Sequence, residues 1–372
     1  MKKSSAGKKN LRIPFGNSWM WVWLALITFL LTELLSKFPA FTGSVYSRGL
    51  YPVVAAVLSR ISYWLPFSLG DMCYVLLVLL VLAGVILLLI RKINVGKFLK
   101  ILVNMLAMLY VLFYWLWGFN YYRDRLNQRL QIAVSEPTDE VFLEVARELI
   151  LETNASRVDP DGLPASQIDS LVEEAYRNLS GFLELNYPGG VRRAKSITFS
   201  DFFAKASILG YYGPFFNEIH LNDHLLPVQY PQVLAHEKAH QFGITGEAEA
   251  NFYAWLVCTR SPSPELNYSA NLYLLRFFLY RGMQVEGFEP LTGLIDEPVK
   301  EDIRRVTAHW KALRSEKIDR VATWVNDMYL KSNKIEGGVN DYRGVVKLVM
   351  DFKADEAAQE RLEKEFADLK ND

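Results

Sequence analysis

The sequence contains few of the residues on which several protein classes depend. Only two of its 372 residues are cysteines, which excludes a disulfide scaffold and a zinc site built from cysteines alone. Acidic side chains are scarce at the start: residues 1–125 carry 14 basic and three acidic side chains. Residues 126–372 carry 27 basic and 38 acidic ones, so the formal net charge of the chain is zero. An acidic C-terminal part without a phosphate-binding glycine loop excludes nucleic acid as the expected partner.

Long apolar stretches, by contrast, are abundant. They cover residues 19–35, 72–90 and 101–119, and the last two have 19 residues each without a formal charge. A hydrocarbon core of about 30 Å needs about 20 helical residues, so we expect three transmembrane helices and a membrane domain over residues 1–125, with the lipid bilayer as a partner. The first stretch also resembles a secretory signal, but no small-residue cleavage site follows it, and an uncleaved anchor is expected.

Basic residues predict the orientation of these spans. Five lysines and arginines precede the first span and four lie in residues 91–100, whereas residues 37–70 carry only three. Since Lys- and Arg-rich loops remain in the cytoplasm, the N-terminus and residues 91–100 should be cytoplasmic. The multi-pass protein would then lie in the inner membrane with its C-terminal domain outside the cytoplasm. Residues 50–69 should form an interfacial helix or pack between the spans. The aromatic residues at the end of the third span fit a belt at the outer interface: Trp115, Trp117, Tyr121 and Tyr122.

Residues 126–372 are predicted to form an α-rich α+β domain with a small sheet. Helical periodicity marks residues 139–152 and 166–185 and much of the chain after residue 246. Residues 195–200 and 216–221 are typical of short strands, with glycine-containing turns between them. This pattern predicts a sheet that precedes a central helix.

The central helix should begin at Pro231 and end near Gly243. It contains His236, Glu237 and His240 in the pattern HExxH. Residues four apart lie on one helix face, so the two histidines can bind one zinc ion, Zn2+. Glu237 can take a proton from water that the zinc activates. With five histidines in the chain and glutamate at roughly 7% of residues, the pattern is expected by chance only about 0.004 times, so incidental histidines on a solvated helix face are the weaker interpretation.

A catalytic zinc usually has three protein ligands and one open position. A histidine at position 246 would complete the metzincin pattern, but Gly246 stands there. Glu247 and Glu249 remain, and they lie about 200° apart around a helix, so only one can face the metal. We predict Glu247, because Asn251 shares its face and can support a ligand histidine through a hydrogen bond. The alternative is that both glutamates only stabilise the first turn of a helix, because the helix dipole favours negative charge there.

At these residues the sequence resembles the gluzincins, zinc peptidases with HExxH on one helix and a glutamate ligand on the next. The stretch from Glu247 to Asn251 (EAEAN) is similar to their Glu-x-x-Ala-Asp/Asn signature, which implies that Glu247 is a ligand and Asn251 supports a histidine. The gap between His240 and Glu247 is shorter than in most of those families. The whole layout also resembles an uncharacterised bacterial family of membrane-anchored, zincin-like proteins, in which a Tyr-Leu-Lys…Gly…Tyr stretch follows, here residues 329–342.

The surroundings of the site are less well defined by the sequence. Residues 216–221 precede the zinc helix as the substrate-pairing edge strand does in zincins. His220 on this strand is either a cleft residue or, more simply, a surface histidine. Tyr268 is either a cleft residue or part of the core or rim. The sequence therefore predicts a membrane-anchored zinc metallopeptidase that hydrolyses a peptide or protein substrate outside the cytoplasm. The alternatives are a membrane sensor or transducer and a structural protein, each with a zincin-like zinc site that does not hydrolyse.

Overall fold

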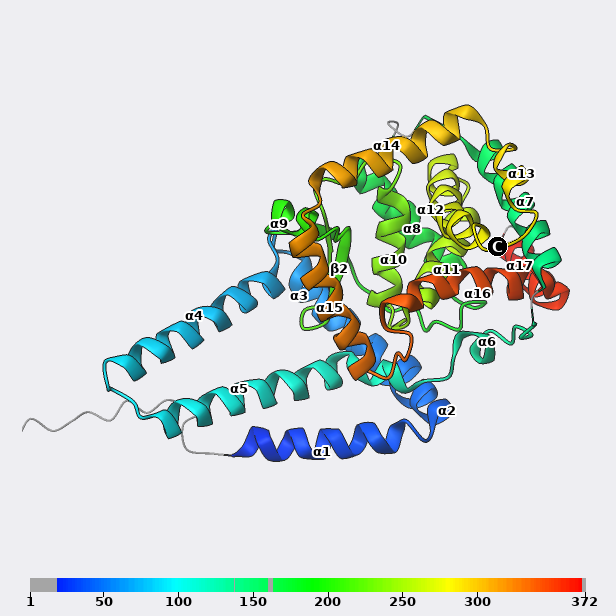
Figure 1. Cartoon of the computed structure of the whole chain (residues 1–372). Coiled ribbons are helices and arrows are strands. Elements are labelled where there is room, and N and C mark those ends of the chain that lie inside the picture. Colours follow the sequence, from blue (N-terminus) through cyan, green and yellow to red (C-terminus); the bar gives the residue numbers. More distant parts are fainter. Residues whose placement is uncertain (1–18, 137, 160–162, 370–372) are drawn as a thin grey trace, which may run out of the picture.

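The apolar stretches of the first third form three long helices. The structure, a computed structural model that describes residues 19–136, 138–159 and 163–369, contains them as α1 (Met20–Leu35), α4 (Leu69–Leu89) and α5 (Val95–Leu116). All three extend from one side of a helix-rich body (Figure 1). Among the described residues, α4 and α5 are each long and apolar enough to cross a membrane. Helix α1 meets this test only together with residues 39–63, from which a bend of 117° separates it, so there are two candidate spans, or three with this pair.

Polar caps set the ends of the two longest helices. Ser68 caps α4 by accepting a hydrogen bond from the backbone N–H of Asp71, at 2.8 Å. Asn94 caps α5 in the same way through Lys97. Helix α5 therefore begins inside the stretch that we predicted as a basic loop, because an asparagine cap starts a helix even where the first turn carries lysine. The connection between the two helices is correspondingly shorter than predicted.

The segment after α1 forms short helices rather than a loop. These are α2 (Pro39–Thr42), the π-helix η1 (Gly43–Leu50) and α3 (Tyr51–Tyr63). One face of α3 packs on the body: the carbonyl of Ala55 accepts from Asn217, and that of Ser62 accepts from Lys195. The opposite face of α3 is exposed. These contacts join α3 to the body, which differs from the predicted packing between the spans, and its outer apolar surface is open.

A three-stranded sheet lies next to α3 among the described residues. Strands β1 (Ala194–Ser196), β2 (Gly210–Gly213) and β3 (Glu218–Leu221) are arranged in the order β1-β3-β2. β1 is parallel to β3 and β2 is antiparallel to it. Residues 216–221 are therefore wrongly predicted as an edge strand, since β3 is central. The edge strand nearest the central helix is β2. Its sequence resembles a turn because it begins and ends with glycine, at Gly210 and Gly213.

The rest of the body is helical. After the 3-10 helix η2 (Gly118–Tyr122), the helices are α6 (Leu126–Arg129), α7 (Asp139–Ser156), α8 (Ala165–Asn178), α9 (Ser200–Lys205), α10 (Tyr230–Gln241), α11 (Glu247–Thr259), α12 (Pro264–Gly282), α13 (Glu289–Thr292), α14 (Glu297–Leu313), α15 (Glu316–Ser332), η3 (Gly338–Gly344), α16 (Val345–Ala354) and α17 (Glu356–Leu369). The expected α-rich fold with a small sheet is confirmed. Nearly every residue of α10 and α11 is buried, so these two helices form the centre of the body.

Candidate metal centre

Helix α10 carries His236, Glu237 and His240, and the chain turns sharply where this helix ends. Gly243 has a φ of +85°, and a Cβ added there would lie 3.0 Å from atoms of both Asn120 and Tyr51. Only glycine fits this conformation and this close approach. The turn leads the chain back so that α11 begins beside the two histidines.

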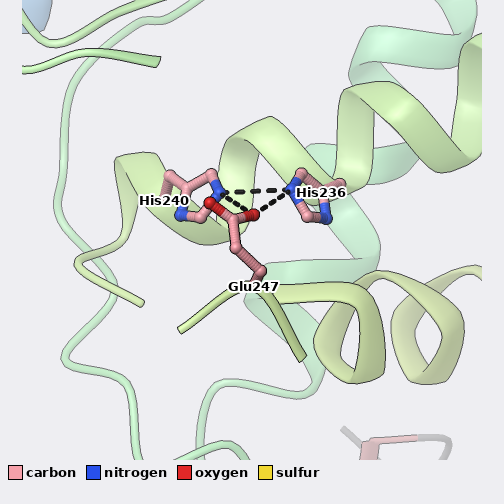
Figure 2. A group of neighbouring side chains, drawn as sticks. All are labelled: His236, His240 and Glu247. Carbon is pink, nitrogen blue, oxygen red and sulfur yellow. Dashed lines mark hydrogen bonds and ion pairs between the residues drawn. The ribbon is translucent and has the colours of Figure 1, made fainter. Parts of the chain in front are cut away.

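The turn brings Glu247, the first residue of α11, between the histidines (Figure 2). Its Oε2 lies 3.2 Å from Nε2 of His236 and 3.3 Å from Nε2 of His240. The two Nε2 atoms are themselves 3.2 Å apart. All three side chains are buried, and they form a group whose possible metal-binding atoms lie within 4.8 Å of one another.

Hydrogen bonds on the far side of each imidazole determine which nitrogen is free. Nδ1 of His236 lies 2.8 Å from Oδ1 of Asn251, and Nδ1 of His240 lies 2.7 Å from the backbone oxygen of Ile244. Both partners are acceptors, so both Nδ1 atoms donate and each neutral ring keeps a lone pair on Nε2. Among the described residues, Glu247 Oε2 has no hydrogen-bond partner other than these two imidazoles, with which it pairs. Two nitrogen lone pairs and one carboxylate oxygen that converge in this way fit the ligand set of a zinc ion.

The pKa shifts of His240 and Glu247 also fit a site for a cation. Burial would lower the pKa of His240, but the carboxylate of Glu247 raises it to about 9. Burial would raise the pKa of Glu247, yet the imidazoles of His240 and His236 hold it below its ordinary value. Without a metal, the group therefore keeps a proton, which offsets the repulsion between its converging lone pairs. A divalent cation would replace that proton, since metal binding to histidine is coupled to proton release.

Glu237 lies on the same helix but outside this group. A Cβ added to Gly210 in β2 would lie 3.0 Å from Oε1 of Glu237, so the carboxylate sits against the edge strand. Burial raises the pKa of Glu237. A carboxylate with a raised pKa is suited both to accept a proton and to return it.

The two glutamates of α11 point to different places. Glu249 forms an ion pair with Arg129 and accepts a hydrogen bond at 2.8 Å from the backbone N–H of Leu126. It thereby ties α11 to α6 and takes no part in the histidine group. The separation of Glu247 and Glu249 follows from their spacing along one helix.

Two residues predicted near a cleft lie elsewhere. His220 is fully buried, so the prediction of a surface histidine is wrong; its Nε2 lies 2.7 Å from Oγ of Ser68, the cap of α4, and its ring stacks on Tyr211. Tyr268 is also buried, and its hydroxyl donates to Asp302 of α14 at 2.6 Å. The structure places both residues in polar contacts of the core and brings neither to the histidine group.

Sequence reasoning missed several aromatic residues near the histidine group. Trp117 was predicted to lie in an interfacial belt, but it is buried and its Nε1 donates at 2.9 Å to the carbonyl of His240. The Tyr51 hydroxyl donates at 2.6 Å to the carbonyl of Gln241. Both residues come from the apolar N-terminal third of the chain, so the C-terminal end of α10 rests directly on them. Hydropathy alone could not reveal this contact, because both residues look like parts of apolar helices.

The C-terminal stretch 329–342 also lies at the centre. The ring of Tyr342 is nearly parallel to that of His236, with centroids 6.3 Å apart and an angle of 13°. The hydroxyl of Tyr329 accepts from that of Tyr121 at 3.1 Å, and Asp341 accepts from the backbone N–H of Ala248 in the first turn of α11. The sequence had singled out this stretch by its tyrosines, without assigning it a role.

Lys238, inside the HExxH pattern, anchors helix α10. It is fully buried and its Nζ lies 2.7 Å from Asp169 and 2.8 Å from Glu173 of α8. Burial would raise the pKa of Glu173, but Lys238 and Arg192 lower it to about 2. We expect Lys238→Met to cost about 3–5 kcal/mol of unfolding free energy, because it leaves buried carboxylates without their cation. Denaturant unfolding of the purified chain measures this. Lys311→Met, at an exposed lysine, is the control. Equal stability of both variants would contradict the claim that Lys238 anchors the helix.

A comparison with known families gives one match. The family described as "Protein of unknown function (DUF3810)" matches residues 46–350. No curated protein and no solved structure matches the chain. The matched range contains α3, α4 and α5, all residues of the candidate metal centre and the tyrosine stretch beside it. The chain therefore belongs to DUF3810, a family of proteins of unknown function.

Proposed function

We propose that this chain is a membrane-anchored, zinc-dependent peptidase whose active site lies outside the cytoplasm. The observation that carries the proposal is the convergence of His236, His240 and Glu247 on one point, with their free lone pairs directed at it and Glu237 beside them. A sheet that precedes the HExxH helix and a glutamate on the following helix support a zincin-like domain of the gluzincin type.

Each residue would have a separate role in peptide hydrolysis. His236, His240 and Glu247 would hold the zinc ion, which when bound lowers the pKa of a water molecule and polarises a carbonyl group. Glu237 accepts the proton of the attacking water and passes it to the amine that leaves. Asn251 and the carbonyl of Ile244 fix the ring orientation of the two histidines through their Nδ1 atoms.

Strand β2 would position the substrate. It is an edge strand of the sheet, and Gly210 at its start lies against Glu237. A peptide in extended conformation can add to such an edge through main-chain hydrogen bonds. This arrangement would bring a scissile bond next to the carboxylate that handles the proton.

Hydrolysis by the purified full chain tests the proposal. In detergent or nanodiscs, the chain should cleave members of a broad peptide library, lose this activity when a chelator removes the metal, and regain it with zinc. Zinc bound at one ion per chain without any hydrolysis would instead support the sensor or structural alternatives. Hydrolysis that persists after the metal has been removed would contradict the zinc mechanism.

The proposed orientation makes a further prediction. The turn between α4 and α5 lies at the end of the helices remote from the body (Figure 1), and it carries Arg91 and Lys92. Basic loops remain in the cytoplasm, so the body should lie outside. A reporter enzyme that works only outside the cytoplasm should be active when fused after Asp372 and inactive within residues 91–94. The reverse pattern would place the metal centre in the cytoplasm.

A further inference from the structure

Helix α15 presents an apolar stripe that nothing in the described chain covers. Val321, Trp324, Val325 and Met328 occupy one face at helical spacing, and each is between 52% and 61% exposed. The opposite face packs inward through Leu330, which is fully buried. Soluble monomers rarely leave a contiguous stripe of this kind in water, so it requires a partner.

The position of α15 relates this stripe to the candidate spans. At its C-terminal end, the Tyr329 ring contacts Phe113 near the end of α5, with centroids 6.2 Å apart. At its N-terminal end, the backbone N–H of Ser315 donates to the carbonyl of Lys205 in α9. The turn before α9 is in turn attached to α4, since the N–H of Thr198 donates to Asp71. Helix α15 therefore bridges the body-side ends of α5 and α4, on the border of the body from which the spans extend (Figure 1).

Helix α3 bridges the same two ends and has a similar exposed face. It continues from η1, whose Tyr46 hydroxyl donates to the carbonyl of Trp115 at the end of α5, and the next helix after α3 is α4. Its outer face exposes Val53, Val57 and Ile61, each by more than half. Helices α15 and α3 thus both expose apolar faces beside the body-side ends of α4 and α5.

We propose that the α15 stripe, together with the outer face of α3, lies in the outer interfacial layer of the lipid bilayer. This inference rests on the proposed membrane placement, because a bilayer crossed by α4 and α5 has its surface at the ends that α15 joins. An interfacial helix buries its apolar face about 5–10 Å into the headgroup boundary and carries basic residues beside it. Lys317 and Arg320 are exposed next to the stripe, where anionic headgroups would meet them.

The contact has a consequence for the metal centre. The polar side of α15 lies over it: Asn326 hydrogen-bonds to Tyr342, whose ring stacks on His236, and Tyr329 meets Tyr121. The metal centre therefore lies directly behind a helix held at the membrane surface. A bilayer fits the stripe better than a second copy of the chain does. Both ends of α15 lie beside the body-side ends of α4 and α5, where the surface of a bilayer crossed by these helices would be.

Depth-dependent fluorescence quenching tests the proposal on the full chain. In a Cys73→Ser background, Val325→Cys is labelled with an environment-sensitive dye and the protein is placed in vesicles of phosphatidylethanolamine and phosphatidylglycerol. Lipids with a doxyl quencher near the headgroup should remove most of the fluorescence, and lipids with the quencher at the bilayer centre should remove little. Glu289→Cys on α13, far from the spans in Figure 1, should respond to neither lipid.

A label in the span separates failure of this proposal from failure of the membrane placement. Leu79→Cys in α4 should be quenched by the central doxyl group. If Leu79→Cys is quenched and Val325→Cys responds only to an aqueous quencher, the stripe lies in water and the proposal is wrong. If Val325→Cys is shielded from all quenchers and shows dye–dye contact, a second copy covers the stripe and the proposal is also wrong. If neither position is quenched by lipid, the membrane placement itself has failed and this proposal fails with it.

Discussion

Glu237→Gln is expected to keep its zinc and to lose nearly all peptidase activity. Glutamine has almost the same shape but accepts no proton at neutral pH, and general-base assistance is worth about 10²–10⁴ in rate. Turnover of any peptide that the wild-type chain hydrolyses should fall by at least that factor. Single-turnover kinetics together with zinc analysis of the same preparations measure both quantities.

The fold should survive this substitution, because Glu237 makes no ion pair with the described residues that the variant would break. Equal melting temperatures of Glu237→Gln and wild type would show that the loss is chemical. If Glu237→Gln and wild type cleave at the same rate with zinc in both, then Glu237 is not the base and the assigned mechanism is wrong.

Glu247→Ala is expected to lose zinc and activity together. Loss of an outer partner of a metal ligand already weakens metal affinity by about 10–100-fold, and loss of the ligand itself should weaken it by more. Asn251→Ala, which removes only the hydrogen bond to His236, should show the smaller effect. Competition with a chromophoric zinc chelator measures the zinc affinities of the wild-type chain, Glu247→Ala and Asn251→Ala.

Glu249→Gln is the matched control on the same helix. Glutamine retains an oxygen for the N–H of Leu126 but weakens the contact with Arg129, so this variant should lose some stability and keep its zinc affinity. If Glu249→Gln releases the metal while Glu247→Ala retains it, the ligand assignment is reversed and the role given to Asn251 falls with it.

The convergence of His236, His240 and Glu247 could be predicted because local geometry determines their arrangement. The spacing of His236 and His240 places both on one face of any α-helix, whatever surrounds it. The choice between Glu247 and Glu249 needed the angle between neighbouring positions, a helix that begins near Gly246, and the presence of Asn251 on the face of Glu247. Short-range rules of this kind hold because the helix itself supplies the geometry.

The contacts around that centre could not be predicted, since they join distant parts of the chain. The carbonyl of His240 accepts from Trp117, and a sequence of apolar residues gives no sign of this partner. His220 looked like a surface residue, yet the cap of α4 holds it in the core. Strand β2 was taken for a turn, because Gly210, which admits Glu237 beside the strand, and Gly213 also resemble turn residues.

Zinc X-ray absorption spectroscopy of the purified wild-type chain tests the central claim most directly. The account predicts one zinc ion per chain, with imidazole nitrogen and carboxylate oxygen as protein ligands and no sulfur, and a spectrum that changes when a hydroxamate occupies the open position. His236→Ala should lack this signal. A wild-type chain purified with zinc present that binds none, or a spectrum that His236→Ala leaves unchanged, would contradict it.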